Sequence, residues 1–181
     1  MKEVKAVLII QRVYREHLKR CNEILEWTKH NLFKDKKIGN KLEKIWGNNM
    51  IGGKKTNQWT TKLGEYIVKR TLELKGNKVR RPKCINGYKP DWETDEYIYE
   101  VKTRNWTTSG TAGEKVYGVP FKYSDVPRLY GKPLKIVCVA YQEEEMNNKI
   151  FSNKISIEKK LMKKIWSEMD ITFEKFSQLR I

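Results

Sequence analysis

The sequence is poor in the residues that build soft metal centres and disulfide frameworks. It has two histidines, His17 and His30, and three widely spaced cysteines, Cys21, Cys84 and Cys138. Neither a zinc-binding spacing nor a Cys–His pair occurs, which argues against a zinc site and against acid/base chemistry that depends on histidine. An odd number of dispersed cysteines is typical of a reducing compartment, so we expect an intracellular protein.

Long apolar runs are missing as well. No stretch of about 18 apolar residues occurs, so we expect no segment that spans a membrane. Residues 1–10 carry a short apolar patch without a small-residue cleavage site, and a basic segment follows at once. We therefore expect no signal peptide.

Positive charge is what the sequence has in excess. Lys and Arg number 38 against 22 Asp and Glu, which gives a net charge of +16 over 181 residues and a pI near 9.7. This surplus indicates a polyanionic partner, with nucleic acid the first choice and an anionic membrane surface the second. Six Trp, nine Tyr and five Phe indicate a packed interior, and the length suits one domain with an appendage.

The most informative stretch covers residues 89–102, Lys-Pro-Asp-Trp-Glu-Thr-Asp-Glu-Tyr-Ile-Tyr-Glu-Val-Lys. Its Tyr, Ile and Val residues predict a strand, on which Glu100 and Lys102 share one face. The polar residues 94–96 predict a hairpin turn. A two-residue turn places Asp91 opposite Glu100, whereas a three-residue turn shifts the pairing by one. A solvated hairpin with an ion pair would show the same pattern.

Two parts of this stretch, Pro90-Asp91 and Glu100-Val101-Lys102, resemble the active-site signature of the PD-(D/E)xK nuclease superfamily. The order of the expected elements is also similar to the core of that superfamily. We therefore expect an α/β fold, with a restriction-endonuclease-like core of a central mixed β-sheet flanked by helices. The expected elements are a helix at 60–75, a strand or its approach at 78–83, the hairpin, a short helix within 119–130, a doubly buried strand at 134–141, a loop beginning at 142–145, a helix at 156–169 and a last helical turn or two over 173–179.

The resemblance implies a metal-dependent DNA endonuclease similar to type II restriction enzymes. Asp91 and Glu100, with the backbone carbonyl of Val101, would hold one or two Mg²⁺ ions, for which Mn²⁺ would substitute. Lys102 would orient or help to deprotonate the attacking water. Glu65 matches an acid on the helix before the first strand that often completes the cluster. Its alternative role is to complement the helix dipole.

Two other functions stay open. A junction-resolving or DNA-repair nuclease of the same superfamily would share this site. A non-catalytic nucleic-acid-binding module, with a partner-binding N-terminal helix, belongs to another class. Cutting both strands of a duplex symmetrically would favour a homodimer.

Two polar loops and their margins supply the candidate DNA contacts. The Gly- and Lys-rich segment 52–58 suits a phosphate backbone, and the segment 104–115 follows the catalytic-type strand directly. A solvated linker and a plain surface loop are the respective alternatives. The candidate residues are Lys54, Lys55, Gln58, Thr60, Arg104, Ser109, Thr111 and Lys115, together with Glu114 in the second loop.

We expect residues 1–50 to form a basic helical appendage and residues 51–181 to form the nuclease-like domain. Within the appendage, Ile10-Gln11, Arg15 and Arg20 have the spacing of the IQ motif that binds calmodulin-like proteins, with Glu16 in place of its glycine. The basic amphipathic pattern of 4–27 fits three roles: core packing or dimerisation, phosphate contact, or capture by such a partner.

Overall fold

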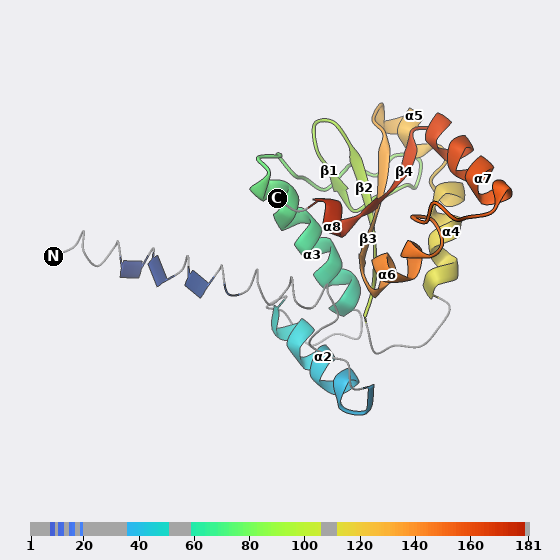
Figure 1. The fold of residues 1–181 in the computed structure, drawn as a ribbon. Coiled ribbons are helices and arrows are strands. Elements are labelled where there is room, and N and C mark those ends of the chain that lie inside the picture. Colours follow the sequence, from blue (N-terminus) through green and yellow to red (C-terminus); the bar gives the residue numbers. More distant parts are fainter. Residues whose placement is uncertain are drawn as a thin grey trace.

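A computed structural model describes residues 8–9, 11–12, 15–16, 19, 36–50, 59–105 and 112–179. These residues form an α/β fold in which one sheet is packed with helices (Figure 1). In this described part of the chain, no helix has the length and apolar character needed to cross a membrane. The expected α/β class, with a mixed sheet flanked by helices, is confirmed.

The sheet has four strands in the order β1-β2-β3-β4. β1 (Trp92–Glu93) is antiparallel to β2 (Ile98–Arg104), whereas β3 (Leu134–Ala140) runs parallel to both β2 and β4 (Ile171–Lys175). Every residue of β3 except Lys135 is buried, as expected of a strand covered on both faces. The doubly buried strand predicted at 134–141 is therefore confirmed as β3, which ends one residue earlier because Tyr141 begins α6.

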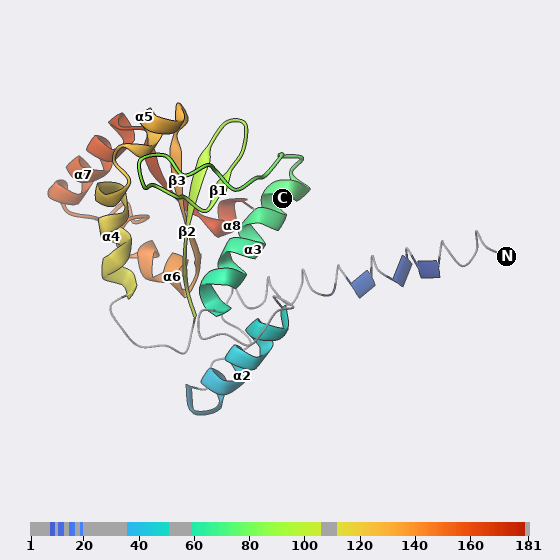
Figure 2. The ribbon, with the colours of Figure 1, turned by 180° about the vertical axis from the view of Figure 1, so that it is seen from behind.

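Helices cover both faces of the sheet (Figures 1 and 2). One face packs against α3 (Trp59–Leu74) and α8 (Phe176–Leu179), through a core that includes Leu63, Ile67, Val101, Val137 and Phe176. The other face packs against α4 (Ala112–Lys122), α5 (Val126–Tyr130) and α6 (Tyr141–Asn147). Side chains alternate along β2, so Tyr99 and Val101 belong to the first core and Ile98 to the second.

Gly64 lets α3 approach the sheet unusually closely. A Cβ atom at this position would lie 1.7 Å from Thr103 Oγ1 and 2.7 Å from Thr103 Cβ. Thr103 is β-branched and stands on a strand, so it cannot rotate away freely. The close contact fixes the first turns of α3, and with them Glu65, against β2.

Two turns contain a glycine with positive φ. α3 ends before Gly76, which has φ +84°, and the Asn77 N–H donates to the Leu72 carbonyl at 3.1 Å. Asn86 and Gly87 both have positive φ and join a single bridge between Ile85 and Tyr88.

Of the two forms expected for residues 78–83, a strand or its approach, the structure has the approach: Arg80 forms a single bridge to Glu93, and its neighbours form no strand. Two other expectations about elements are corrected. Residues 142–145 lie in the helix α6 rather than in a loop. The segment expected to be helical from Phe173 onward is first the strand β4 and only then α8. The short helix expected within 119–130 is confirmed as α5, and it is preceded by α4, which begins at Ala112 and contains Pro120.

The helix α7 (Ile157–Glu168) forms as predicted, with Ser156 as its N-cap, but it buries none of its residues. Its periodic apolar residues Ile157, Leu161 and Ile165 are exposed, and so are its four lysines, Lys159, Lys160, Lys163 and Lys164. Trp166 makes the inward contact instead, since its ring centroid lies 5.6 Å from that of Phe173 in β4.

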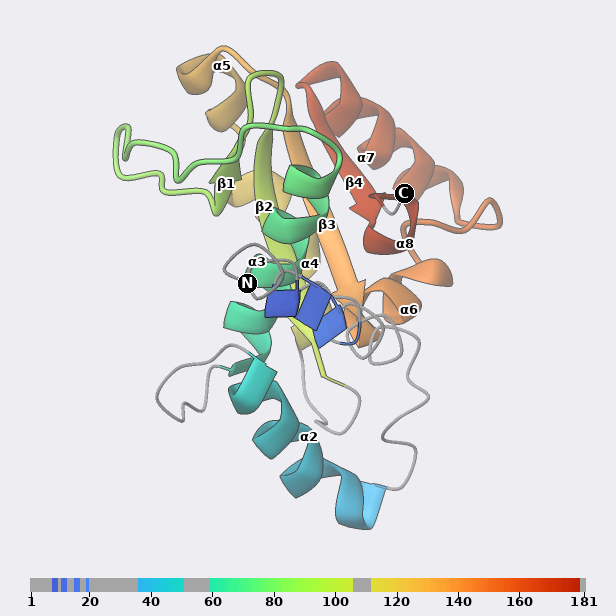
Figure 3. The same ribbon diagram turned by 90° about the vertical axis from the view of Figure 1, so that its left-hand side faces the viewer.

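The helix α2 (Lys36–Met50) lies in the part of the chain expected to be an appendage (Figure 3). Trp46 and Met50 pack against the core that α3 forms with the sheet, and Glu43 is fully buried. The described positions of the IQ-like segment, Gln11, Arg15 and Glu16, are helical and exposed, whereas Ile10 and Arg20 lie outside the described residues. The division of the chain at residue 50 stays a prediction.

We predict that Gly64→Ala lowers the free energy of unfolding by about 1–3 kcal/mol, the usual effect of forcing extra atoms into a packed contact. Gly118→Ala is the matched control, because Gly118 also lies in a helix but a Cβ there would meet nothing within 4 Å. The control should be neutral or slightly stabilising. Urea denaturation of both variants checks this, and equal midpoints would contradict the close approach of α3.

Candidate active site

The hairpin between β1 and β2 has the two-residue turn, so the open question of its register is settled. Trp92 pairs with Tyr99 and Glu93 with Ile98, and the Thr94 N–H donates to the Tyr97 carbonyl at 2.9 Å. Continued by one residue, this register brings Asp91 opposite Glu100. Regular pairing ends there, because the Asp91 carboxylate itself accepts the Val101 N–H through Oδ2 at 2.7 Å.

Glu100 and Lys102 lie side by side on the face of β2 that packs against α4 and α5. Lys102 Nζ is 2.6 Å from Glu100 Oε1, and the side chains are 30% and 6% exposed respectively. The other carboxylate oxygen, Glu100 Oε2, is buried without a hydrogen-bond partner. The Tyr123 hydroxyl lies near this carboxylate. Burial, followed by the negative charges of Glu100 and Asp91, raises the pKa of Tyr123.

Glu65 approaches Asp91 from α3, on the opposite face of the sheet. Its backbone carbonyl accepts the indole N–H of Trp92 at 2.9 Å, which ties this turn of the helix to the hairpin. Its carboxylate forms an ion pair with the guanidinium of Arg81. The same guanidinium lies 3.7 Å from Asp91 Oδ1 and donates to the Asp91 carbonyl at 2.9 Å.

Asp91 thus stands at the edge of β2 between two other carboxylates. Burial, together with the negative charges of Glu100 and Glu65, raises the pKa of Asp91 to about 7. The Val101 N–H and the charge of Lys102 oppose this increase without cancelling it. A carboxyl group that titrates near neutral pH in a cluster of acids is typical of a functional site rather than of a surface hairpin.

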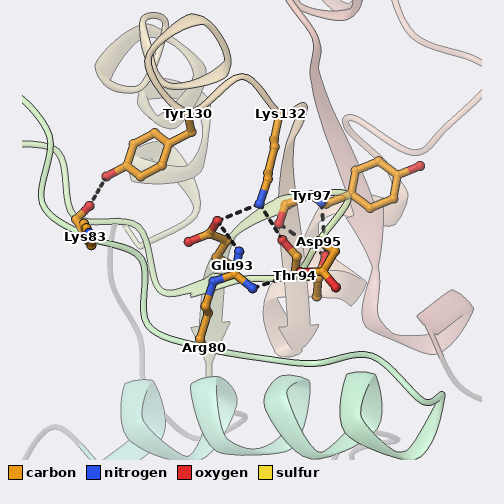
Figure 4. Close-up of polar contacts among 8 residues, drawn as sticks. All are labelled: Arg80, Lys83, Glu93, Thr94, Asp95, Tyr97, Tyr130 and Lys132. Carbon is orange, nitrogen blue, oxygen red and sulfur yellow. Dashed lines mark hydrogen bonds and ion pairs between the residues drawn. The ribbon is translucent and has the colours of Figure 1, made fainter.

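A second polar cluster holds the tip of the hairpin in place (Figure 4). Lys132, which precedes β3, contacts Glu93 Oε1 at 2.6 Å and the Thr94 carbonyl at 2.9 Å. Arg80 joins Glu93 at 2.7 Å and Asp95 at 3.0 Å. Burial raises the pKa of Glu93, but its hydrogen bonds to Lys132 and Arg80 outweigh burial and lower it below the ordinary value. These contacts keep the register that presents Asp91.

The site offers few carboxylate ligands, which suits a hard cation that needs only one or two of them. Among the described residues, no group of three or more His, Cys, Asp or Glu side chains is arranged to hold a metal ion. Mg²⁺ usually takes one or two protein carboxylates, with water and substrate phosphate completing its shell. Asp91 and the unpartnered Glu100 Oε2 fit that need. The N–H and C=O of one strand residue point to the same side, so the Val101 carbonyl also faces Asp91.

The residues expected to contact DNA are only partly described. Thr60 is half-buried in the first turn of α3, and Lys115 is exposed on α4. The Arg104 side chain is 11% exposed and ion-paired with Glu145 at 2.8 Å, so a phosphate contact would require that pair to open. Lys54, Lys55, Gln58, Ser109 and Thr111 lie outside the described residues, as do the side-chain contacts of Glu114.

Sequence reasoning missed two residues of the site, Arg81 and Tyr123. Arg81 lies in a basic run, Lys78 to Lys83, that resembles any solvated surface segment. Only the bridge between its neighbour Arg80 and Glu93 brings it to the acids. Tyr123 follows the C-terminus of α4, and nothing in its spacing relates it to Glu100. The PD-(D/E)xK pattern was the signal that found the other residues.

Comparison with models of protein families, with curated proteins and with solved structures finds no match for this chain.

The raised pKa of Asp91 predicts an unusual dependence of stability on pH. An aspartate in the unfolded chain has a pKa of about 3.9, so between that value and about 7 the folded state binds the proton more tightly. The stability that this group contributes is complete below the unfolded pKa and is lost as the pH rises through the folded pKa.

We therefore predict that, without divalent metal, the free energy of unfolding of the wild type falls relative to that of Asp91→Asn as the pH rises from about 4 to about 8. The difference should change by a few kcal/mol, on the order of 1.4 kcal/mol per unit of pKa shift. Asparagine keeps an acceptor for the Val101 N–H but does not titrate. Urea titrations over this range check the prediction, and parallel pH profiles would contradict it.

Proposed function

We propose that the protein is a metal-dependent endonuclease that hydrolyses phosphodiester bonds in DNA. One observation carries the proposal: the Asp91 carboxylate accepts the Val101 N–H at 2.7 Å, and the residues directly before and after Val101 on β2 are Glu100 and Lys102, which lie together on one face of the strand. Two acids and a lysine are thereby gathered at one sheet edge. The PD-(D/E)xK resemblance, based on the same residues, supports this assignment.

Each residue of the cluster has a role that its surroundings support. Asp91 and Glu100 would hold one Mg²⁺ together with the Val101 carbonyl. Bound there, the ion would supply Lewis-acid stabilisation of the phosphate and a more acidic water. The half-buried ammonium of Lys102 is fixed beside Glu100, where it can orient that water or accept its proton. Glu65 adds negative charge from α3 and would favour retention of the cation.

The net charge of +16 supports a nucleic-acid substrate. A basic protein gains affinity for DNA by displacing the cations condensed on its phosphates, which favours binding irrespective of base sequence. DNA rather than RNA follows from the resemblance to restriction enzymes. A junction-resolving or repair nuclease would use the same cluster on a different DNA shape.

A specific observation favours a second candidate, a non-catalytic module that binds nucleic acid. The acids of the cluster already have basic partners within the chain, since Glu65 pairs with Arg81 and Glu100 with Lys102. A cluster neutralised in this way could serve only to hold the hairpin. Binding without cleavage of duplex, junction or flap DNA in Mg²⁺ would favour this module over the enzyme.

We predict that Asp91→Ala and Lys102→Ala each lower the rate of Mg²⁺-dependent DNA cleavage by on the order of 100-fold or more, as removal of a single charge-stabilising group does in other enzymes. DNA affinity should change little. Lys75→Ala is the matched control for charge, because Lys75 is exposed just beyond α3 and distant in sequence from the hairpin. Single-turnover rates check the prediction. Undiminished cleavage by Asp91→Ala would refute the site assignment.

Affinity for DNA should also depend steeply on salt. We predict that the logarithm of the association constant falls linearly with the logarithm of salt concentration, with a slope of about −0.9 per phosphate contacted on duplex DNA. Fluorescence anisotropy with a labelled duplex in EDTA measures this slope without cleavage. Association that is insensitive to salt would exclude a surface that follows the phosphate backbone.

A further inference from the structure

Arg81 brings a positive charge to two acids of this site. Its guanidinium forms an ion pair with Glu65, lies 3.7 Å from Asp91 Oδ1, and donates to the Asp91 backbone carbonyl at 2.9 Å. The guanidinium carbon also stacks over the Trp92 ring, 3.9 Å from its centroid. One side chain therefore connects the acid on α3, the acid on the hairpin and the aromatic residue between them.

These ion pairs hold the Arg81 side chain in place, but they are weak enough for another cation to replace the guanidinium. The Arg81 side chain is 51% exposed, while Glu65 and Asp91 are only 17% and 18% exposed. Solvent screens the pairs from the side of the guanidinium, and exposed pairs of this kind contribute little to stability. The two carboxylates remain confined at the sheet edge if the guanidinium leaves, so their need for a counter-ion persists.

The backbone that carries Arg81 is fixed by its neighbour. The Arg80 N–H and C=O both bond to Glu93, at 2.9 Å and 2.8 Å, and the Arg80 side chain contacts Glu93 and Asp95 (Figure 4). Further along, the Lys83 carbonyl accepts the Tyr130 hydroxyl at 2.6 Å. Release of the Arg81 guanidinium would therefore need side-chain rotation only, without a change in the fold.

We propose that Arg81 is an internal counter-ion that a divalent cation must displace to occupy the site between Asp91 and Glu100. This inference rests on the proposed function, because it assumes that the cluster takes a metal. Metal binding would then move the guanidinium off Glu65 and off the Trp92 ring.

Calorimetric titration with Mg²⁺ alone, without nucleic acid, tests the competition. We predict that Arg81→Ala binds Mg²⁺ roughly 10-fold more tightly than the wild type, because two partly exposed ion pairs no longer compete. Arg128→Ala is the control, since Arg128 is an exposed arginine of α5 that pairs with Asp125, the N-cap of the same helix. The control should bind Mg²⁺ as the wild type does. Arg81→Lys, which keeps the charge but loses the planar fork, should be intermediate.

Tryptophan fluorescence tests the displacement itself and distinguishes it from simple repulsion between two cations. In the wild type, saturating Mg²⁺ should change the emission, because the guanidinium leaves the Trp92 ring. The change should be absent from Arg81→Ala, which has no guanidinium to move. It should also be absent from Trp92→Phe, although that variant still binds Mg²⁺ in the calorimeter. Thermal denaturation of each variant checks that it is folded.

The outcomes separate this inference from the function on which it rests. Equal Mg²⁺ affinity of the wild type and Arg81→Ala would overturn the role of Arg81 while leaving the metal site intact. The same emission change in Arg81→Ala as in the wild type would also overturn it. Failure of both proteins to bind Mg²⁺ would refute the metal site itself, and the proposed function with it.

Discussion

The pairing register of one short hairpin determines whether this site exists. With two residues in the turn, Asp91 reaches the edge of β2 beside Glu100, and its carboxylate takes the Val101 N–H at 2.7 Å. A slip of one residue would turn every side chain of a strand to the other face. The contacts of Lys132 and Arg80 at the hairpin tip therefore support the site from a distance, because they hold the register.

Several carboxylates lie close together at one sheet edge and repel one another. Basic side chains of the same chain neutralise them. Burial and two neighbouring carboxylates raise the pKa of Asp91, which shows how poorly its charge is tolerated there. Lys102 neutralises Glu100 on one face of the sheet and Arg81 neutralises Glu65 on the other. The metal site proposed above would exchange one of these bases for a divalent cation at the same edge, so the stability of the hairpin and its proposed chemistry depend on the same charges.

Sequence patterns predicted the parts of the fold that depend on local preferences. The helix α3 with its glycine stop, the doubly buried strand β3 and the hairpin itself follow from apolar spacing and turn residues. β4 was mistaken for helix because Phe173 and Phe176 have helical spacing, and the pairing with β3 that overrides it is long-range. Arg81 was missed for a similar reason: its contacts with Glu65 and Asp91 join segments 16 and 10 residues apart in the chain. The burial of Glu100 likewise depends on α4 and α5, which pack against its face of β2, so the pattern of the strand alone could not predict it.

The most direct test of the proposed metal site is to locate a cation at the hairpin. Crystals grown in Mn²⁺ and measured at the manganese absorption edge would show any bound ion by its anomalous scattering. If the proposed metal site is correct, one strong peak is expected in contact with the carboxylates of Asp91 and Glu100 and with the Val101 carbonyl, with the Arg81 guanidinium moved away from Glu65. A protein saturated with Mn²⁺ whose peak lies elsewhere, or whose hairpin shows no peak, would contradict it.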